Sequence, residues 1–186
     1  MKDIILFGVQ WAWKWTQAQK ILTTYQEQYS YFSTWDFFRA ISGWGPNAIG
    51  EYVKHKIQAW ELIADEVTIA VFDVYIKTIQ DANKAMLLDW YPRSKTQIDS
   101  LLWFLRENNR DFIWIFFDLS ESIAIQRMLE RWRSDDTQDS IKKRLDLYRQ
   151  ETQPIIDYFA DHAPLVHIDA SADIDTIFEK VQQALA

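Results

Sequence analysis

Short apolar runs alternate along the chain with longer segments in which apolar side chains recur at helical spacing. The apolar runs have the length and composition of buried strands. We expect strands at residues 4–7, 29–33, 85–89, 113–118 and 165–168. The segments between them predict helices at residues 17–27, 34–41, 48–58, 94–107, 121–131, 140–159 and 174–185, and a long one from Asp65.

The same pattern predicts which side chains are buried. The long helix from Asp65 is expected to bury a face that carries Val67, Ala70, Val71, Val74 and Ile79. Trp103 and Trp114 fall in an apolar helix and an apolar strand, and we interpret both as ordinary core side chains.

Strands that alternate with helices predict an α/β fold in three layers, a five-stranded parallel sheet with helices on both faces. Ligands bind such sheets at the carboxyl ends of the strands. Residues 8–16, 34–39, 89–93 and 118–120 should all lie at that edge. The 186 residues contain no repeat or linker, so we expect a single domain.

The segment after the first strand is the strongest local signal. Residues 8–16 read GVQWAWKWT, a tight loop ending in Lys14 and Thr16 before a helix. A strand, a loop ending in Lys-x-Thr and a helix are the setting of a phosphate-binding P-loop. Such a loop needs glycines so that its N–H groups can point at phosphate oxygens, yet tryptophan stands at three of its positions.

Composition narrows the class of protein. The net charge of −7 argues against nucleic acid or an anionic membrane as the main partner. Residues 112–117, the longest apolar run, are too short to cross a bilayer, and the first strand follows Met1 too closely for a signal peptide. We therefore expect a cytoplasmic protein. The absence of cysteine excludes disulfides and thiolate ligands.

Charged residues near the expected sheet edge add to the P-loop signal. Asp89 ends an apolar strand, where a carboxylate can hold Mg²⁺ directly or through water. Arginines that could converge on one cleft come from four segments: Arg39, Arg93, Arg127, Arg131, Arg133 and Arg144. One arginine alone is more often a solvated surface charge. The set together with the loop favours phosphoryl transfer, which needs positioning and positive charge.

With these motifs the chain resembles the adenylate kinase family, in its bacterial form with a short lid. Residues 7–18, FGVQWAWKWTQA, match the family's FGxxGxGKGTQA apart from three tryptophans. Residues 33–40 match STGDxxRA, and residues 60–66 match GELxPDE. Residues 87–93 match LLDGYPR, and residues 131–136 match RGRxDD. The resemblance covers essentially the whole chain.

The resemblance implies a role for each matching position. The loop around the ATP phosphates would be Trp11, Ala12, Trp13, Lys14, Trp15 and Thr16, with Lys14 reaching the transferred group. Arg131 and Arg127 would contact ATP, and Asp89 would anchor the Mg²⁺ shell. The AMP site would be lined by Thr34, Arg39, Glu61, Leu62, Ile63, Trp90, Tyr91, Pro92, Arg93 and Gln97. Arg133 and Arg144 would clamp the phosphates from the lid side.

The resemblance also implies moving parts. Residues of about 34–63 would form the mobile nucleoside monophosphate-binding insert, and about 131–137 a short lid that carries no zinc. A monomer is implied. Thr34 and Gln97 suit an adenine base, so AMP is favoured over UMP or CMP. A UMP or CMP kinase and a non-catalytic relic or engineered scaffold remain alternatives.

The tryptophans follow a rule. Seven of the ten fall where the family motifs carry glycine: Trp11, Trp13, Trp15, Trp35, Trp60, Trp90 and Trp132. The chain holds 4 glycines against about 13 expected for its length. UGA encodes glycine in one bacterial genetic code and tryptophan in another, so we hypothesise a decoding artefact, with deliberate mutation as the alternative. With literal tryptophans we expect severe loss of ATP binding and turnover.

Overall fold

The computed structural model describes residues 1–9, 12–43, 47–59, 61–80, 83–130, 138–160 and 165–186, with the backbone alone at residues 80, 138–140, 144, 147 and 151–152. These residues form one α/β domain built on a sheet of five parallel strands, in the order β2-β3-β1-β4-β5. The strands are β1 (Asp3–Gly8), β2 (Tyr29–Ser33), β3 (Ala85–Asp89), β4 (Phe112–Asp118) and β5 (Leu165–Asp169). The predicted fold class is confirmed.

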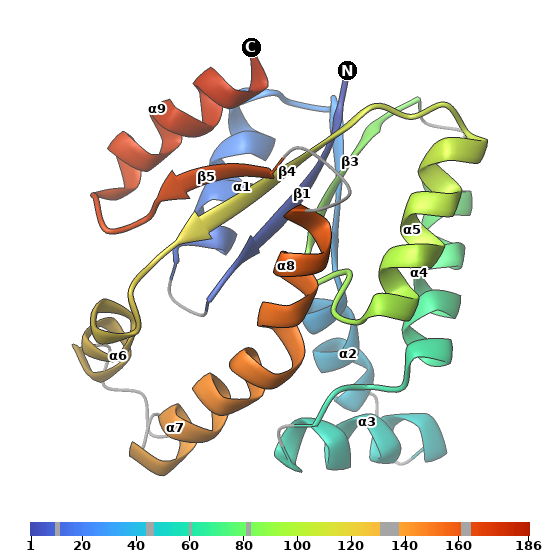
Figure 1. Ribbon diagram of the computed structural model, residues 1–186. Helices are drawn as coiled ribbons and strands as arrows, with labels where there is room; N and C mark the ends of the chain where they lie inside the picture. The colour runs from blue at the N-terminus through green and yellow to red at the C-terminus, as the bar shows by residue number, and fades with distance from the viewer. Residues whose placement is uncertain (10–11, 44–46, 60, 81–82, 131–137, 161–164) are drawn as a thin grey trace.

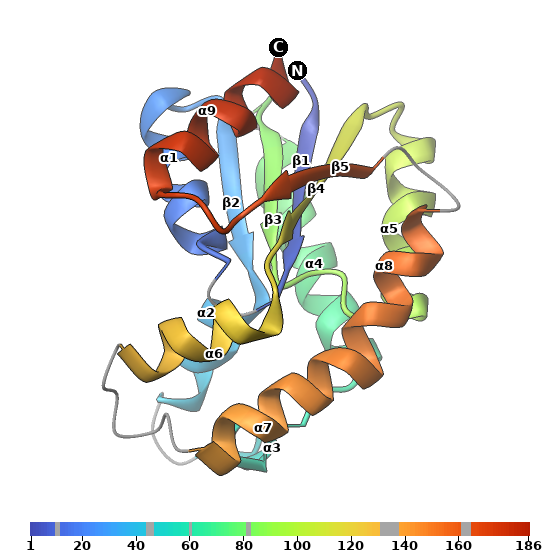
Figure 2. The ribbon, with the colours of Figure 1, turned by 60° about the vertical axis from the view of Figure 1, so that its left-hand side comes forward.

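Helices cover both faces of the sheet (Figure 1, Figure 2). One face packs against α1 (Lys14–Thr24), α6 (Glu121–Glu130), α7 (Gln138–Leu147) and α9 (Ile174–Leu185). The other packs against α4 (Asp65–Gln80), α5 (Lys95–Glu107) and α8 (Gln153–Ala160). Strand side chains alternate between the two cores, so that Ile4 and Leu6 face the first and Ile5 and Phe7 the second.

Two further helices occupy the segment expected to form the monophosphate-binding insert. They are α2 (Thr34–Ser42) and α3 (Ala48–Ala59), and they lie beyond the carboxyl ends of the strands together with α6 and α7 (Figure 1). Ser33 caps α2 by accepting a hydrogen bond from the N–H of Asp36. The carboxyl edge of the sheet is therefore surrounded by helices from distant parts of the chain.

An ion pair between Asp3 and Arg110 links the amino-terminal end of β1 to the segment before β4. Asp3 is 1% exposed, and its two carboxylate oxygens accept from Nε and Nη2 of Arg110 at 2.7 Å each. Asp3 also accepts from the N–H of Met86 at 2.7 Å, and Arg110 donates to the carbonyl of Lys84. The pair thereby ties β1 to the start of β3 and to the turn before β4.

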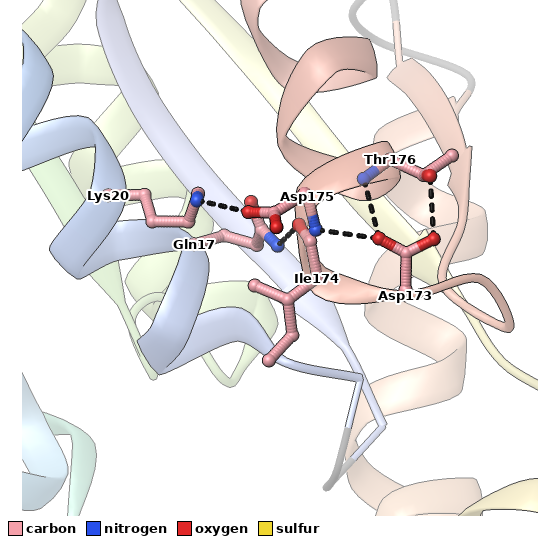
Figure 3. A network of polar contacts seen from close by, with 6 residues as sticks. All are labelled: Gln17, Lys20, Asp173, Ile174, Asp175 and Thr176. Carbon is pink, nitrogen blue, oxygen red and sulfur yellow. Dashed lines mark hydrogen bonds and ion pairs between the residues drawn. The ribbon is translucent and has the colours of Figure 1, made fainter.

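The helix after the P-loop is held by the closing helix of the chain, as Figure 3 shows. The amide of Gln17, which is buried in α1, donates to the carbonyl of Ile174 at 2.9 Å. Lys20 forms an ion pair with Asp175 at 2.6 Å. Asp173 caps α9 by accepting from the N–H groups of Asp175 and Thr176. These contacts hold α1 against the start of α9.

Two expectations about helices need correction. The first helix spans Lys14–Thr24 rather than 17–27, because the chain turns at Tyr25 and takes a positive φ at Glu27. The helix expected over 140–159 is interrupted by a π-helical turn, Tyr148–Thr152. Pro154 explains this interruption, since its ring excludes a regular helical hydrogen bond to the preceding turn.

Two expectations about burial were wrong. Helix α4 buries Thr68, Phe72, Ile76 and Ile79, whereas Val74 is 62% exposed and Ala70 is exposed. The buried stripe is rotated because Phe72 packs its ring against Tyr91 and Phe32. Trp103 is 65% exposed on the outer face of α5, while Trp114 is fully buried as expected.

Candidate active site

The loop after β1 enters α1 through a strained residue. Trp13, the residue before the helix, has φ 58° and ψ 15° and gives no side-chain cap. This left-handed conformation suits glycine and costs any other residue about 1–2 kcal/mol. The indole Nε1 of Trp13 is buried without a hydrogen-bond partner. The backbone at position 13 therefore has the shape of a glycine-containing P-loop although tryptophan occupies it.

Gly8 begins the same loop and needs its lack of a side chain. Its φ is +143°, and a Cβ there would lie 2.7 Å from the carbonyl oxygen of Phe117 on β4. Ala12 is fully buried, and Trp15 is 59% exposed near the start of α1, next to the half-buried Thr16. Position 11 lies outside the described residues. The described part of the loop thus leaves β1 close against β4 and turns back into α1.

Lys14 points back over the carboxyl end of β1. Its ammonium Nζ donates to the carbonyl oxygens of Gly8 at 2.7 Å and Val9 at 3.1 Å. Burial lowers the pKa of Lys14 from 10.5 to about 8, although the nearby carboxylate of Asp89 acts in the opposite direction. The ammonium is therefore held at the carboxyl end of β1 by two backbone carbonyls.

Asp89 ends β3 at the same edge of the sheet. It is 1% exposed, and burial raises its pKa from 3.8 to about 6, opposed chiefly by the charge of Lys14. Its Oδ2 accepts from the hydroxyl of Tyr31 at 3.4 Å, and its Oδ1 is buried without a partner. An unpartnered buried carboxylate oxygen leaves room for a ligand that donates to it, such as a metal-bound water.

The ring of Trp90, the residue after Asp89, lies close to the cations of Lys14 and Arg93. Trp90 has φ 62°, again a conformation that favours glycine. Its ring stacks on that of Trp35 with centroids 5.7 Å apart. Nζ of Lys14 lies 5.4 Å and the guanidinium of Arg93 4.6 Å from the centroid of the Trp90 ring. The indole thus lies against two cations that the sequence assigned to phosphate.

A cavity of about 30 Å³ remains at this place. Its lining comprises Leu6, Phe7, Gly8, Lys14, Trp90, Tyr91, Pro92, Arg93 and Tyr148. That volume is roughly the share of one water molecule. The structure thus brings Lys14 and residues 90–93 together, but the space is far too small for a nucleotide phosphate chain.

Tyr148 is a lining residue that the sequence did not identify. It begins the π-helical turn between α7 and α8 and packs against both hydrophobic cores. Burial raises its pKa above the ordinary value. π-Helical turns are frequent at functional sites. In the sequence, Pro154 was the signal that could have predicted this turn.

The residues expected at the AMP site lie beside Trp90. Thr34 is buried at the start of α2 and donates to the carbonyl of Trp90 at 2.7 Å. Gln97 is buried in the first turn of α5, where its amide contacts Arg93 and Asp65. Thr34 and Gln97 therefore reach the segment 90–93 from two different helices.

The remaining members of the expected AMP site lie farther out on the insert. Arg39 is exposed on α2, and Glu61 is exposed and paired with Lys56. Leu62 and Ile63 are half-buried between α3 and α4. Thr34 and Gln97 thus each contact the segment 90–93, while no described contact joins Arg39 to this segment.

The expected ATP-side arginines are only partly described. Arg127 donates to the carbonyls of Ala170 at 2.9 Å and Ser171 at 3.0 Å, and its guanidinium lies 5.2 Å from the ring centroid of Trp13. Arg131 and Arg133 lie outside the described residues, as does the expected lid at 131–137. Arg144 lies on α7, and only the backbone of this residue is described.

A larger cavity, of about 350 Å³, lies between α6 and α7. Its floor is aliphatic, with Ile125, Leu129, Ile141 and Leu145, and Arg149 at its rim pairs with Glu121. None of its lining residues is among the candidate site residues. Candidate residues such as Lys14, Trp90 and Arg93 line the smaller cavity instead.

Comparison with known proteins identifies the family of this chain. A family model described as adenylate kinase matches residues 6–163. An adenylate kinase of Prochlorococcus marinus strain MIT 9301 is 35% identical over 186 residues, which cover 100% of this chain and 99% of the relative. One of Oenococcus oeni is 29% identical over 188 residues, covering 100% of this chain and 98% of the relative.

A kinase with another name also matches. A uridylate kinase of Saccharomyces cerevisiae is 30% identical over 187 residues, which cover 98% of this chain and 89% of the relative. No helix among the described residues is long and apolar enough to cross a membrane. The matched family, the parallel sheet and the Lys14 loop agree with one another, and the chain belongs to the adenylate kinase family.

Proposed function

We propose that this protein catalyses ATP + AMP ⇌ 2 ADP by direct in-line transfer of a phosphoryl group. One observation carries the proposal: Lys14 at the start of α1 and Arg93 after β3 line one cavity at the carboxyl edge of the sheet, and the carboxylate of Asp89 at the end of β3 acts on the pKa of Lys14. A fold that needed these residues only for stability would gain nothing from withdrawing a lysine and a carboxylate from water side by side.

The two nucleotides would approach from opposite sides of this cavity. The loop of residues 11–16, with Arg127 and Arg131, would hold ATP. Thr34, Arg39, residues 61–63, Trp90 to Arg93 and Gln97 would hold AMP, and Arg133 and Arg144 would close over the phosphates. Both the insert, residues of about 34–63, and the lid, about 131–137, would move toward the cavity when nucleotides bind.

Mg²⁺ would enter with ATP. The described residues contain no cluster of three or more carboxylate, imidazole or thiolate ligands. The donor that fits is Oδ1 of Asp89, because it is buried and unpartnered. Mg²⁺ keeps most of its waters and binds phosphate oxygens, so one carboxylate that holds a water suffices. When bound, the ion would neutralise charge on the phosphates.

The choice of monophosphate has two candidates. Thr34 and Gln97 offer hydrogen bonds suited to adenine, which favours AMP. The similarity to a yeast uridylate kinase supports the alternative of a pyrimidine monophosphate. We propose that AMP is the preferred monophosphate substrate. We also propose that the protein acts as a monomer in the cytoplasm.

The tryptophans bear directly on activity. Trp13 and Trp90 occupy left-handed backbone positions, and the ring of Trp90 lies where phosphate would meet Lys14 and Arg93. We propose that the chain as written is severely impaired, and that the active gene product carries glycine at positions 11, 13, 15, 35, 60, 90 and 132. Reading the codons tests the decoding hypothesis: UGA at these positions would support it, and UGG would refute it.

A coupled assay of ADP formation tests the function. The chain as written should be nearly inactive, and a variant with all seven tryptophans changed to glycine should turn over AMP in preference to UMP and CMP. Preference for UMP or CMP would establish the pyrimidine alternative. No activity in the glycine variant, if it is folded by circular dichroism, would establish a non-catalytic relic. Normal turnover by the chain as written would refute the impairment.

A further inference from the structure

The side chain of Gln97 is held at both ends of its amide. Its Oε1 accepts from the backbone N–H of Arg93 at 2.8 Å, and its Nε2 donates to Oδ1 of Asp65 at 2.7 Å. The residue is 2% exposed. Its partners are therefore fixed before any nucleotide arrives.

Helix capping explains only the first of these contacts. Ser94 caps α5 by accepting from the N–H of Gln97, and a glutamine three residues after such a cap commonly reaches back to the chain before the helix. The bond from Arg93 to Oε1 is of this kind. The contact with Asp65 is different, because it joins α5 to the first residue of α4, at the end of the expected insert.

These two contacts determine which way round the amide lies. A backbone N–H can only donate, and an ionised carboxylate can only accept. A flipped amide would place its N–H₂ against the N–H of Arg93 and its oxygen against the carboxylate of Asp65. Both contacts would be repulsive, so the observed orientation is locked. One N–H of Nε2 and one lone pair of Oε1 remain to meet a ligand.

A locked amide distinguishes two purines of the same size. Adenine offers an amino donor beside a ring-nitrogen acceptor, and glutamine pairs with it through both amide atoms. Hypoxanthine, the 6-oxo purine of inosine monophosphate (IMP), offers an acceptor beside a ring N–H donor, the reverse arrangement. A glutamine that could turn over would serve either base. One that cannot turn over would select the 6-amino purine.

We propose that Asp65 is a positioning residue that fixes the amide of Gln97 and thereby selects a 6-amino over a 6-oxo purine monophosphate. This inference rests on the proposed function, in which Gln97 faces the base. Asp65 acts through Gln97 and does not touch the nucleotide.

The test compares kcat/KM for AMP with that for IMP in the seven-glycine variant and in three further changes made to it. Asp65→Ala should lower the AMP-to-IMP ratio by about tenfold or more, because a good bidentate contact contributes at least that much discrimination. Asp65→Asn, which keeps an acceptor oxygen in place, should retain most of the ratio. Asp73→Ala, at an exposed position of the same helix, is the matched control and should leave the ratio unchanged.

The outcomes separate this inference from the proposed function. An unchanged ratio in Asp65→Ala would overturn the inference, as would an equal loss with both substrates, which would indicate a structural role. An inactive seven-glycine parent would instead refute the proposed function.

A measurement without catalysis tests the contact itself. In the chain as written, the side-chain amide protons of Gln97 should exchange slowly with solvent by ¹⁵N NMR, and Asp65→Ala should accelerate this exchange at least tenfold. Exchange that is equally fast in both proteins would overturn the inference whatever the activity of the parent.

Discussion

Asp89 is buried and Lys14 partly buried at the same edge of the sheet, and each charge stabilises the other. This attraction is smaller than the cost of withdrawing either charge from water. The pKa of Lys14 falls from 10.5 to about 8, and that of Asp89 rises from 3.8 to about 6. Both shifts disfavour the charged form, so the site is held in place at the expense of stability. Active sites that select charged substrates commonly have this property.

The first prediction concerns pH. Because the pKa of Asp89 is raised on folding, the folded chain keeps a proton that the unfolded chain releases between about pH 4 and 6. The free energy of unfolding should therefore fall relative to that of Asp89→Asn as the pH rises through this window, by an amount on the order of 2 kcal/mol. Urea denaturation at several pH values measures it, and a difference independent of pH would contradict it.

The contribution of Lys14 to the free energy of unfolding has the opposite pH dependence. Between about pH 8 and 10.5 the unfolded chain holds the proton that the folded chain has lost, so the Lys14 contribution to stability rises with pH. Near pH 7, between the two windows, both groups are mostly charged in both states. Lys14→Met should therefore abolish the alkaline rise and extend the acid window of Asp89 to higher pH, because the change removes the cation that lowers the pKa of Asp89.

The second prediction separates the tryptophans by substrate. Trp11, Trp13 and Trp15 belong to the ATP loop, whereas Trp35 and Trp90 stack on one another beside Thr34. Changing the first three to glycine should restore binding of ATP but not of AMP, and changing Trp35 and Trp90 should do the reverse. Isothermal titration calorimetry measures both. Trp103→Ala, at an exposed position far from the motifs, is the control and should restore neither.

The third prediction concerns stability away from the site. Asp3→Asn should destabilise the fold by about 3 kcal/mol, because it leaves the partly buried guanidinium of Arg110 without its charged partner. Asp175→Asn removes the more exposed ion pair with Lys20 and should cost less than about 1 kcal/mol. Urea midpoints of the two variants give the comparison, and equal losses would show that burial of the first pair does not matter.

The fourth prediction concerns the transferred group. In the seven-glycine variant, Lys14→Met should lower kcat by about a hundredfold or more, since one preorganised donor at a developing charge contributes that much. The KM for AMP should change little, because Lys14 lies on the ATP side. Lys20→Met, which removes an ammonium from the same helix but outside the cavity, should keep normal kcat.

The sequence predicted the sheet and the edge at which the site lies. Apolar runs such as residues 113–117 are buried on both faces, so composition alone marks them as strands. The loop at Lys14 and the carboxylate at Asp89 were found because a strand end is a fixed place in a parallel sheet. Position along the chain was enough for both.

Contacts between elements that are distant along the chain could not be predicted from the sequence. The bond from Gln97 to Asp65 depends on how α4 and α5 pack, and nothing in either helix announces it. The exposure of Trp103 was missed because hydrophobicity cannot say which side of an apolar helix meets the sheet. Tyr148 was missed because a continuous helix was expected over residues 140–159, whereas a π-helical turn begins at Tyr148.

The glycines that survive in this chain are as informative as those replaced. Gly43 has φ −91°, and a Cβ there would meet its nearest atom at an ordinary 3.5 Å, so a larger residue would be tolerated. Positions 13 and 90, with φ 58° and 62°, tolerate one poorly, yet they carry tryptophan. Natural selection would not have kept glycine at position 43 while placing tryptophan at positions 13 and 90. Under the decoding hypothesis the substitutions follow codon usage and not backbone geometry, so ribosomes that read UGA as glycine and ribosomes that read it as tryptophan would make two different proteins from one gene.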